Sequence, residues 1–197
     1  MPLRLLARTL LAAAVAAAVA AAVAAASARA DAPTATLLDL KEFSLTYTVV
    51  HALHVVKATC KKAEGKAAVT PGAPARVQVR ARVACFDSGD SNRDVHMREV
   101  THEALHPFVG VKGSIDGVTL PLTAPAERTL NAKVELNGET QSVAIPVTLS
   151  QEGALVRARL KFSVGLEGFK IERPSLLTIK VEDAVALEGE LSFEAAK

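Results

Sequence analysis

Residues 130–149 read LNAKVELNGETQSVAIPVTL, and this stretch decides the fold. Apolar residues alternate with polar ones on both sides of the central Asn137-Gly138, which is the spacing of two β-strands that each bury one face. Because Asn and Gly tolerate positive φ, the dipeptide predicts a two-residue hairpin turn. In the register that follows, Leu130 lies opposite Ile145, and the apolar rows of both strands share one face.

The chain then continues into a third strand. Glu152-Gly153 predicts a second tight turn, with Val147 opposite Ala158 on the same apolar face. Pro146 cannot donate to a ladder, so we expect a bulge or a locally unpaired edge around it. The three strands together form an antiparallel meander.

The same period of two recurs from residue 43 to the end of the chain. Regularly spaced segments of this kind predict an all-β protein of about eight strands, arranged as an antiparallel barrel or a flattened sandwich. Between Phe86 and Pro107 the apolar spacing is helical instead, and Ser91 with Asp94 is typical of a helix start. We expect one short helix at the mouth of the barrel.

The N-terminus has the pattern of a signal peptide. Arg4 and Arg8 precede an uncharged apolar run that closes with an Ala-x-Ala site at Ala30. The run is short for a membrane span and rich in Ala, so stable membrane insertion is not expected. The sequence therefore predicts a signal peptide over residues 1–30, cleaved after Ala30, and a periplasmic product with a single domain over residues 31–197.

Composition excludes two classes of protein. Half of the 197 residues are hydrophobic and 22% are charged, so the chain can bury one core and is not of the disordered class. Arg4, Arg8 and Arg29 lie in the signal peptide, so the 23 basic residues fall to 20 against 21 acidic ones, a net charge of −1. A nucleic-acid partner is not expected.

One motif resembles a zinc site but lacks its context. His102-Glu103-Ala104-Leu105-His106 matches H-E-x-x-H, in which two His one helical turn apart bind zinc. The residue before a proline is pushed out of the α region, so His106 does not share a helical face with His102. No third ligand follows, and a catalytic zinc needs three. We therefore reject this site.

Three other histidines leave an alternative function open. His51, His54 and His96 supply enough imidazoles for zinc or copper, as a secreted enzyme or metal-binding protein would need. Otherwise the sequence has no recognisable nucleophile motif, paired carboxylates or phosphate-binding loop. We expect no enzyme activity, no catalytic residues and no cofactor, with the histidine site as the alternative.

Cys60 and Cys85 are the two cysteines of a chain expected to reach an oxidising compartment. If Val69 pairs with Val77 across a hairpin, one β-bulge near Gly65 brings both cysteines to the same side at bonding distance. We therefore expect a Cys60–Cys85 disulfide.

Several segments together resemble the YceI-like family. They are FDSG at 86–89, NRDVHM at 92–97, HPFVGV at 106–111 and FKIERPSLL at 169–177, with the Asn137-Gly138 hairpin between them. The resemblance covers residues 43–194. It implies an exported bacterial protein with a lipocalin-like up-and-down barrel that holds a long polyisoprenoid chain, and it implies no catalytic residues.

The residues lead to a compatible function. Inward rows carry small side chains, such as those of Ala58, Ala81 and Ala132, so a closed barrel leaves apolar space for an apolar ligand. We expect a carrier or reservoir for a quinone or prenyl phosphate, with Arg93 and His96 at the head group. A solid barrel that acts as an interaction module is a third alternative. The expected ligand contacts are Leu45, Tyr47, Val79, Val83, Arg93, His96, Val143, Ile145, Ala158, Leu160 and Phe162.

Overall fold

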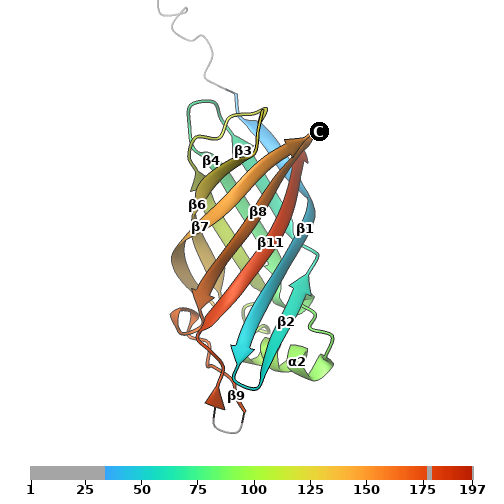
Figure 1. The fold of residues 1–197 in the computed structure, drawn as a ribbon, viewed down its shortest axis with the longest axis vertical. Helices are drawn as coiled ribbons and strands as arrows, with labels where there is room; N and C mark the ends of the chain where they lie inside the picture. Colours follow the sequence, from blue (N-terminus) through green and yellow to red (C-terminus); the bar gives the residue numbers. More distant parts are fainter. Residues whose placement is uncertain (1–33, 177–178, 197) are drawn as a thin grey trace, which may run out of the picture. The chain divides into compact units, whose positions relative to one another are not determined.

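The structure, a computed structural model, describes residues 34–176 and 179–196, so the expected signal peptide lies outside the described residues. Nine strands form one antiparallel sheet, and a two-stranded hairpin of β9 (Ser175–Leu176) and β10 (Ile179–Lys180) stands apart (Figure 1). The strands of the large sheet are β1 (Thr36–His51), β2 (His54–Cys60), β3 (Glu64–Val69), β4 (Ala75–Arg82), β5 (Phe108–Ile115), β6 (Ala126–Leu136), β7 (Glu139–Glu152), β8 (Leu155–Gly165) and β11 (Ala184–Ala195).

Pairing of β1 with β11 closes this sheet into a barrel of eight strands, in the order β11-β8-β7-β6-β5-β4-β3-β1. The prediction of an all-β antiparallel barrel is thereby confirmed, and the flattened sandwich is excluded. Closure also pairs both long edges of the sheet, which would otherwise expose unpaired backbone groups.

The long strand β1 changes its partner and its inward face along its length. Its start pairs with β3, and its second half pairs with β2, the ninth strand of the sheet. The register with β11 shifts between Leu40 and Glu42, where a β-bulge inserts one residue. The bulge moves the inward row from even to odd positions, so Leu38 and Leu40 face the core before it and Leu45 and its odd neighbours after it.

The meander forms as predicted on one side and is displaced on the other. Leu130 pairs with Ile145 across the Asn137-Gly138 turn, as predicted. The β7–β8 register predicted from Glu152-Gly153 is wrong by two residues, because the turn residues are Gly153 and Ala154. Ala158 consequently pairs with Leu149 instead of Val147. A shift of two residues keeps each side chain on its predicted face.

Pro146 lies where β7 has a neighbour on one side only. The pairing of β7 with β6 continues past Pro146 without a register shift, so the expected bulge is absent from this pairing. The pairing of β7 with β8 begins only at Val147. The proline therefore occupies a locally unpaired edge, where a missing N–H donor costs no ladder bond. The 3-10 turn η2 (Glu167–Phe169) packs between β7 and β8 there, with Phe169 only 1% exposed.

The expected short helix is α2 (Ser91–Val100), which lies across one end of the barrel (Figure 1). Its N-cap is Asp90, whose carboxylate accepts hydrogen bonds from the backbone N–H groups of Asn92 and Arg93. The prediction that Ser91 starts the helix with Asp94 as its capping partner is therefore wrong by one residue. We call this end, which also holds the β1–β2 turn and the β9–β10 hairpin, the α2 end, and the opposite one the far end.

The two cysteines form a disulfide, but not in the expected way. Cys60, which is fully buried at the end of β2, is bonded to Cys85 in the 3-10 turn η1 (Val83–Cys85), with a Cα–Cα distance of 5.1 Å. The expected register is wrong, since Val77 pairs with Ala67 and not with Val69. No bulged hairpin is needed, because the chain leaves β2 at Cys60 and starts the separate strand β3 after a break at residues 61–63.

The barrel interior contains two apolar clusters. The larger one extends through the barrel, with Ile145 1% exposed in its middle, and reaches Phe169 and Ile171 at the α2 end. A smaller cluster surrounds the disulfide at the α2 end and is formed by Ala58, Cys60, Ala81 and Phe86.

Candidate functional site

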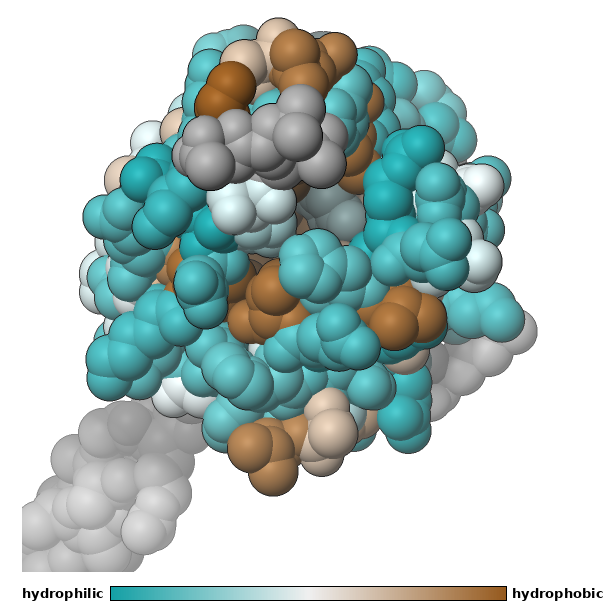
Figure 2. All heavy atoms as spheres, turned by 90° about the horizontal axis from the view of Figure 1, so that it is seen from below, coloured by the Kyte–Doolittle hydropathy of each residue, from teal (hydrophilic) through white to brown (hydrophobic). Residues whose placement is uncertain are grey.

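An apolar cavity of about 280 Å³ lies inside the barrel at the α2 end. Figure 2 views the molecule from this end and shows a hollow framed by polar residues and apolar patches. The barrel wall contributes inward residues of several strands, α2 contributes Met97 and Val100, and Phe86 comes from the segment after η1. The apolar wall residues of the strands are Leu45, Val49, Val56, Val109, Leu136, Val164, Val185 and Leu187.

Basic side chains gather where this cavity meets α2. Arg93, His96 and His54 line it. All three residues are exposed, which places them at the rim of the cavity. The Arg93 guanidinium lies 3.2 Å from the Asp90 carboxylate. Hydrogen bonding from the backbone N–H of Arg93 holds the pKa of Asp90 below its usual value, so Asp90 stays charged and fixes Arg93 at the mouth.

Tyr47 contributes a phenol group to the cavity wall. Its ring packs against that of Phe86 at a centroid distance of 5.5 Å. Burial, assisted by the negative charge of Asp94, raises the pKa of Tyr47 to about 12, so its hydroxyl remains a neutral donor at physiological pH. A ligand in this cavity therefore meets the Tyr47 phenol within a largely apolar surface.

A connecting segment between η2 and β11 covers one side of the mouth. Its residues Pro174 and Val181 line the cavity and are joined by a backbone hydrogen bond. His51 anchors the adjoining hairpin: its Nδ1 accepts from the N–H of Leu53, so its Nε2 carries the hydrogen that it donates to the carbonyl of Ile179 at 2.9 Å. The β1–β2 turn and the β9–β10 hairpin are thus tied together beside the opening.

The structure divides the predicted ligand contacts into two groups. Leu45, Tyr47, Val83, Arg93 and His96 line the cavity. The remaining ones belong to the larger core cluster and do not line the cavity, because alternation identifies the face of a strand but not the depth along the barrel axis. This second group is Val79, Val143, Ile145, Ala158, Leu160 and Phe162.

Several cavity residues were missed from the sequence. Phe86 and Met97 lie outside the strand pattern, and His54 was assigned to the alternative metal site. Leu187 carried a usable signal, because it continues the period of two that recurs from residue 43 to the end of the chain. Ile171, Pro174 and Val181, from the segment before β11, had no such signal, since that segment has no regular period.

The alternative metal site does not form. His51 uses both ring nitrogens in hydrogen bonds, and its ring lies 5.1 Å from that of His54, whereas His96 lies 3.7 Å from Glu99 on α2. Over residues 34–176 and 179–196, no group of three or more His, Cys, Asp or Glu side chains could hold a metal ion.

The H-E-x-x-H segment has left the helix and has a structural role. His102 adopts a φ of 48°, just after the C-cap of α2, and its Nδ1 lies 2.8 Å from the Asn137 side-chain oxygen. Asn137 in turn donates to the carbonyl of Phe169 at 3.0 Å. These bonds connect the end of α2 with the β6–β7 turn and η2.

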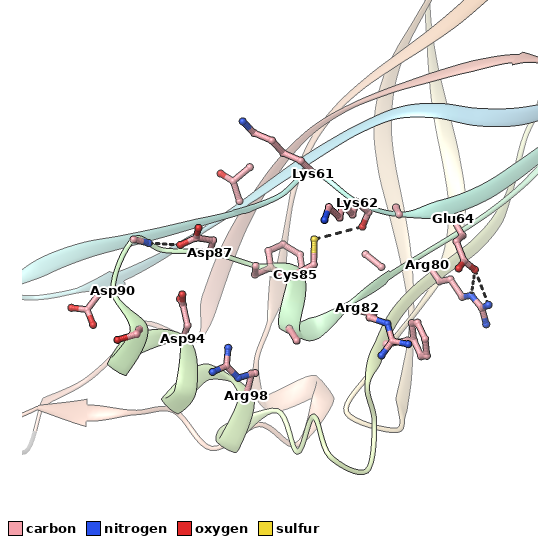
Figure 3. A pocket seen from close by; sticks show the side chains of 18 residues that line it. Lys61, Lys62, Glu64, Arg80, Arg82, Cys85, Asp87, Asp90, Asp94 and Arg98 are labelled. Carbon is pink, nitrogen blue, oxygen red and sulfur yellow. Dashed lines mark hydrogen bonds and ion pairs between the residues drawn. The ribbon is translucent and has the colours of Figure 1, made fainter.

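A second depression, of about 1230 Å³, lies on the outer surface beside the disulfide (Figure 3). Basic and acidic side chains alternate along it, and Arg80 pairs with Glu64 at 2.7 Å. Arg80 and Arg82 both place their guanidinium groups 5.0 Å from the centre of the Phe108 ring. Because charges of both signs are mixed and exposed, this groove offers no net attraction for one class of ion, and we assign no ligand to it.

Helices in the described part of the chain are too short or too polar to cross a membrane.

Two solved structures have the same fold and match most of the residues of the barrel. A polyisoprenoid binding domain from Saccharophagus degradans, implicated in plant cell wall breakdown, matches with a TM-score of 0.67 and 12% identity, over 81% of this chain and 98% of that domain. BcnA from Burkholderia cenocepacia matches with a TM-score of 0.65 and 18% identity, over 76% of this chain and 95% of its own. At these identities the likeness concerns the fold. Comparison with curated proteins gave no match.

The sequence itself matches one family. The model of the YceI-like domain family covers residues 18–193, which include every strand of the barrel up to Phe193 in β11. The resemblance carried by the FDSG, NRDVHM and HPFVGV segments is thereby confirmed, and the chain belongs to the YceI-like domain family.

Proposed function

We propose that this protein binds an isoprenoid lipid, with the apolar chain in the cavity at the α2 end and the polar head at its rim. The observation that carries the proposal is the division of the lining: apolar side chains form the interior, whereas Arg93, His96 and His54 stand at the mouth. Apolar chains gain free energy by burial in such a space, and a charged head stays near water. The polyisoprenoid binding domain with the same fold supports this class of ligand.

The rim favours a ligand whose head accepts hydrogen bonds. A guanidinium presents a planar fork of donors that fits phosphate, and the Tyr47 hydroxyl supplies a donor that suits a quinone carbonyl. A prenyl phosphate or a quinone therefore satisfies the site, and binding needs no chemical step and no cofactor.

The proposed setting is the periplasm, where the protein acts as a carrier or reservoir. Support comes from the signal-peptide pattern of residues 1–30 and from the Cys60–Cys85 disulfide, which suits an oxidising compartment. Amino-terminal sequencing of the exported protein should begin at Asp31. An intact chain recovered from the membrane fraction would contradict this assignment.

The binding proposal is tested by blocking the cavity from one strand. Leu187 of β11 points into the cavity between Tyr47 of β1 and Phe162 of β8, with which it pairs, whereas its neighbour Ala186 is exposed on the outer face. Leu187→Trp fills the cavity, and Ala186→Trp places the same ring outside as the matched control.

The readout is the prenyl lipid that co-purifies with each variant, measured by organic extraction and mass spectrometry against protein concentration. Wild type and Ala186→Trp should carry similar amounts, and Leu187→Trp at least tenfold less at equal folded fraction. Equal lipid in all three proteins, or none in the wild type purified from a host rich in prenyl lipids, would refute the proposal.

A further inference from the structure

Large apolar side chains that are exposed to solvent gather at the α2 end of the barrel. Six such side chains in the described residues are at least 44% exposed. One of them, Leu37, lies at the far end, near the start of β1. The other five lie at the α2 end, and we call them the mouth set: Leu53, Val55, Val95, Leu105 and Ile179. Single exposed apolar residues are common on soluble proteins, whereas a group at one end indicates a surface that binds a partner.

Two hairpins bring three members of the mouth set together at one side of the cavity opening. Leu53 is a turn residue between β1 and β2, and Val55 is the second residue of β2. His51 joins this turn to β10, since it accepts from the N–H of Leu53 and donates to the carbonyl of Ile179 at 2.9 Å. His54, which lies between Leu53 and Val55, lines the cavity. The exposed apolar side chains of the hairpins are therefore next to the opening.

The other two members belong to α2 and to the segment that follows it. Arg93, His96 and Met97 of α2 line the cavity, whereas Val95 lies on the opposite side of the helix, because one turn takes 3.6 residues. Leu105, between α2 and β5, is 76% exposed. Figure 2, which views this end, shows separate apolar patches among the polar residues around the hollow. Exposed apolar side chains thus stand on more than one side of the mouth.

The hairpin side of the mouth is also basic. From residue 43 to residue 63 the sequence contains no Asp or Glu, and Lys57 on β2 is exposed. Lys180, which follows Ile179, is exposed as well. Lysines at such a surface are attracted to anionic lipid headgroups. Acidic residues on α2 and before β11 oppose this attraction elsewhere at the α2 end, so the apolar side chains must supply most of the binding.

The form of the mouth set favours a lipid bilayer over a protein as the partner. A stable protein partner needs about 800 Å² of matching surface on each side. The mouth set instead consists of side chains on separate hairpins, on a helix and on a connecting segment, and each of these can enter the interfacial region of a bilayer. The proposed ligand is itself a lipid, so a bilayer is also its source.

We propose that the α2 end docks on the surface of an anionic lipid bilayer through Leu53, Val95 and Ile179, so that the prenyl chain passes into the cavity without crossing water. The inference rests on the proposed function and adds the partner from which the ligand is taken. Docking of this kind is peripheral and reversible, because only a few side chains enter the interface.

The first experiment measures how lipid-free protein floats with vesicles of phosphatidylethanolamine and phosphatidylglycerol. The wild type should float with them. Leu53→Glu should lower the partition coefficient by about tenfold, and Leu53→Glu/Ile179→Glu should lower it further, because each change removes apolar area from the interface and adds a carboxylate. Leu37→Glu is the matched control at the far end, since Leu37 is 59% exposed and Leu53 61%. It should float as the wild type does.

The second experiment compares uptake of a prenyl lipid from vesicles with binding of a shorter one from solution. The double variant should take up geranylgeranyl phosphate from the same vesicles about tenfold more slowly than the wild type. It should bind geranyl phosphate from solution with unchanged affinity, because neither Leu53 nor Ile179 lines the cavity.

The outcomes separate the inference from the function on which it rests. A wild type that does not bind geranyl phosphate would overturn the proposed function itself. A wild type that binds geranyl phosphate but does not float with vesicles would overturn the docking and leave the function intact, as would a double variant with an unchanged rate of uptake. A dimer that the same substitutions dissociate, without flotation, would show that a second copy covers the mouth set and would also overturn the docking.

Discussion

Removal of the Cys60–Cys85 disulfide should destabilise the barrel, and the size of the loss follows from the conformational entropy that the unfolded chain regains. The bond spans 25 positions in the sequence, and closing a loop of that length in the unfolded chain corresponds to about 3.5 kcal/mol at 25 °C. Changing both cysteines to Ala avoids leaving a buried thiol, so Cys60→Ala/Cys85→Ala should lower the free energy of unfolding by about this amount. The urea m-value should rise slightly, because the unfolded chain without the cross-link exposes more surface.

The assay is urea unfolding of the variant beside oxidised and reduced wild-type protein. Reduced wild type should match the variant within about 1 kcal/mol, since both lack the cross-link. A variant that loses less than about 1 kcal/mol would show that the loop is already constrained in the unfolded chain or strained in the folded one. Two free thiols in denatured, non-reduced wild type would refute the bond itself.

Three further perturbations test the packing of the interior. Tyr47 is the single Tyr in a chain without Trp, so its ultraviolet absorbance reports one group: it should titrate near 12, and its contribution to stability should be complete below pH 10 and lost as the pH rises from 10 to about 12. A midpoint near 10 in the folded protein would be inconsistent with burial. Gly113→Ala should cost about 1–3 kcal/mol of unfolding free energy, because a Cβ there would run into the backbone oxygen of Asn131, whereas Gly110→Ala on the same strand has open space and should cost much less. Equal losses in thermal or urea unfolding would contradict this contrast. Ala158→Phe should cost about 1–3 kcal/mol of unfolding free energy and leave the lipid content unchanged, because Ala158 lies between the buried Leu149 and Leu191 and does not line the cavity. Reduced lipid content at unchanged stability would contradict this.

Local signals in the sequence determined the parts of the fold that depend on near neighbours. Asn137-Gly138 set the register between β6 and β7, because a two-residue turn fixes every pair that follows. The same reasoning failed for β8, where Glu152-Gly153 and Gly153-Ala154 are both short enough to turn. The choice between them depends on packing across the barrel, which no local pattern contains.

Depth along the barrel axis was the main feature that the sequence could not supply. Ile145 and Leu45 both belong to inward rows, yet one lies in the buried core and the other lines the cavity. Their positions depend on which strands lie beside them and on the bulge between Leu40 and Glu42 in β1, both of which arise from pairing between distant segments. The rim residues Arg93 and His96 belong to the one short helix that the apolar spacing between Phe86 and Pro107 predicted, although its start was misplaced by one residue.

The most direct test of the account is the position of the bound chain itself. A farnesyl phosphate with a diazirine at its far end can be irradiated on the protein and the cross-linked residues mapped by mass spectrometry. The account predicts cross-links at the cavity wall, at Leu45, Val164 and Leu187, and none at the buried Ile145 or Leu149, which do not line the cavity. Cross-links at Ile145 or Leu149, or in the charged outer groove of Figure 3, would contradict it.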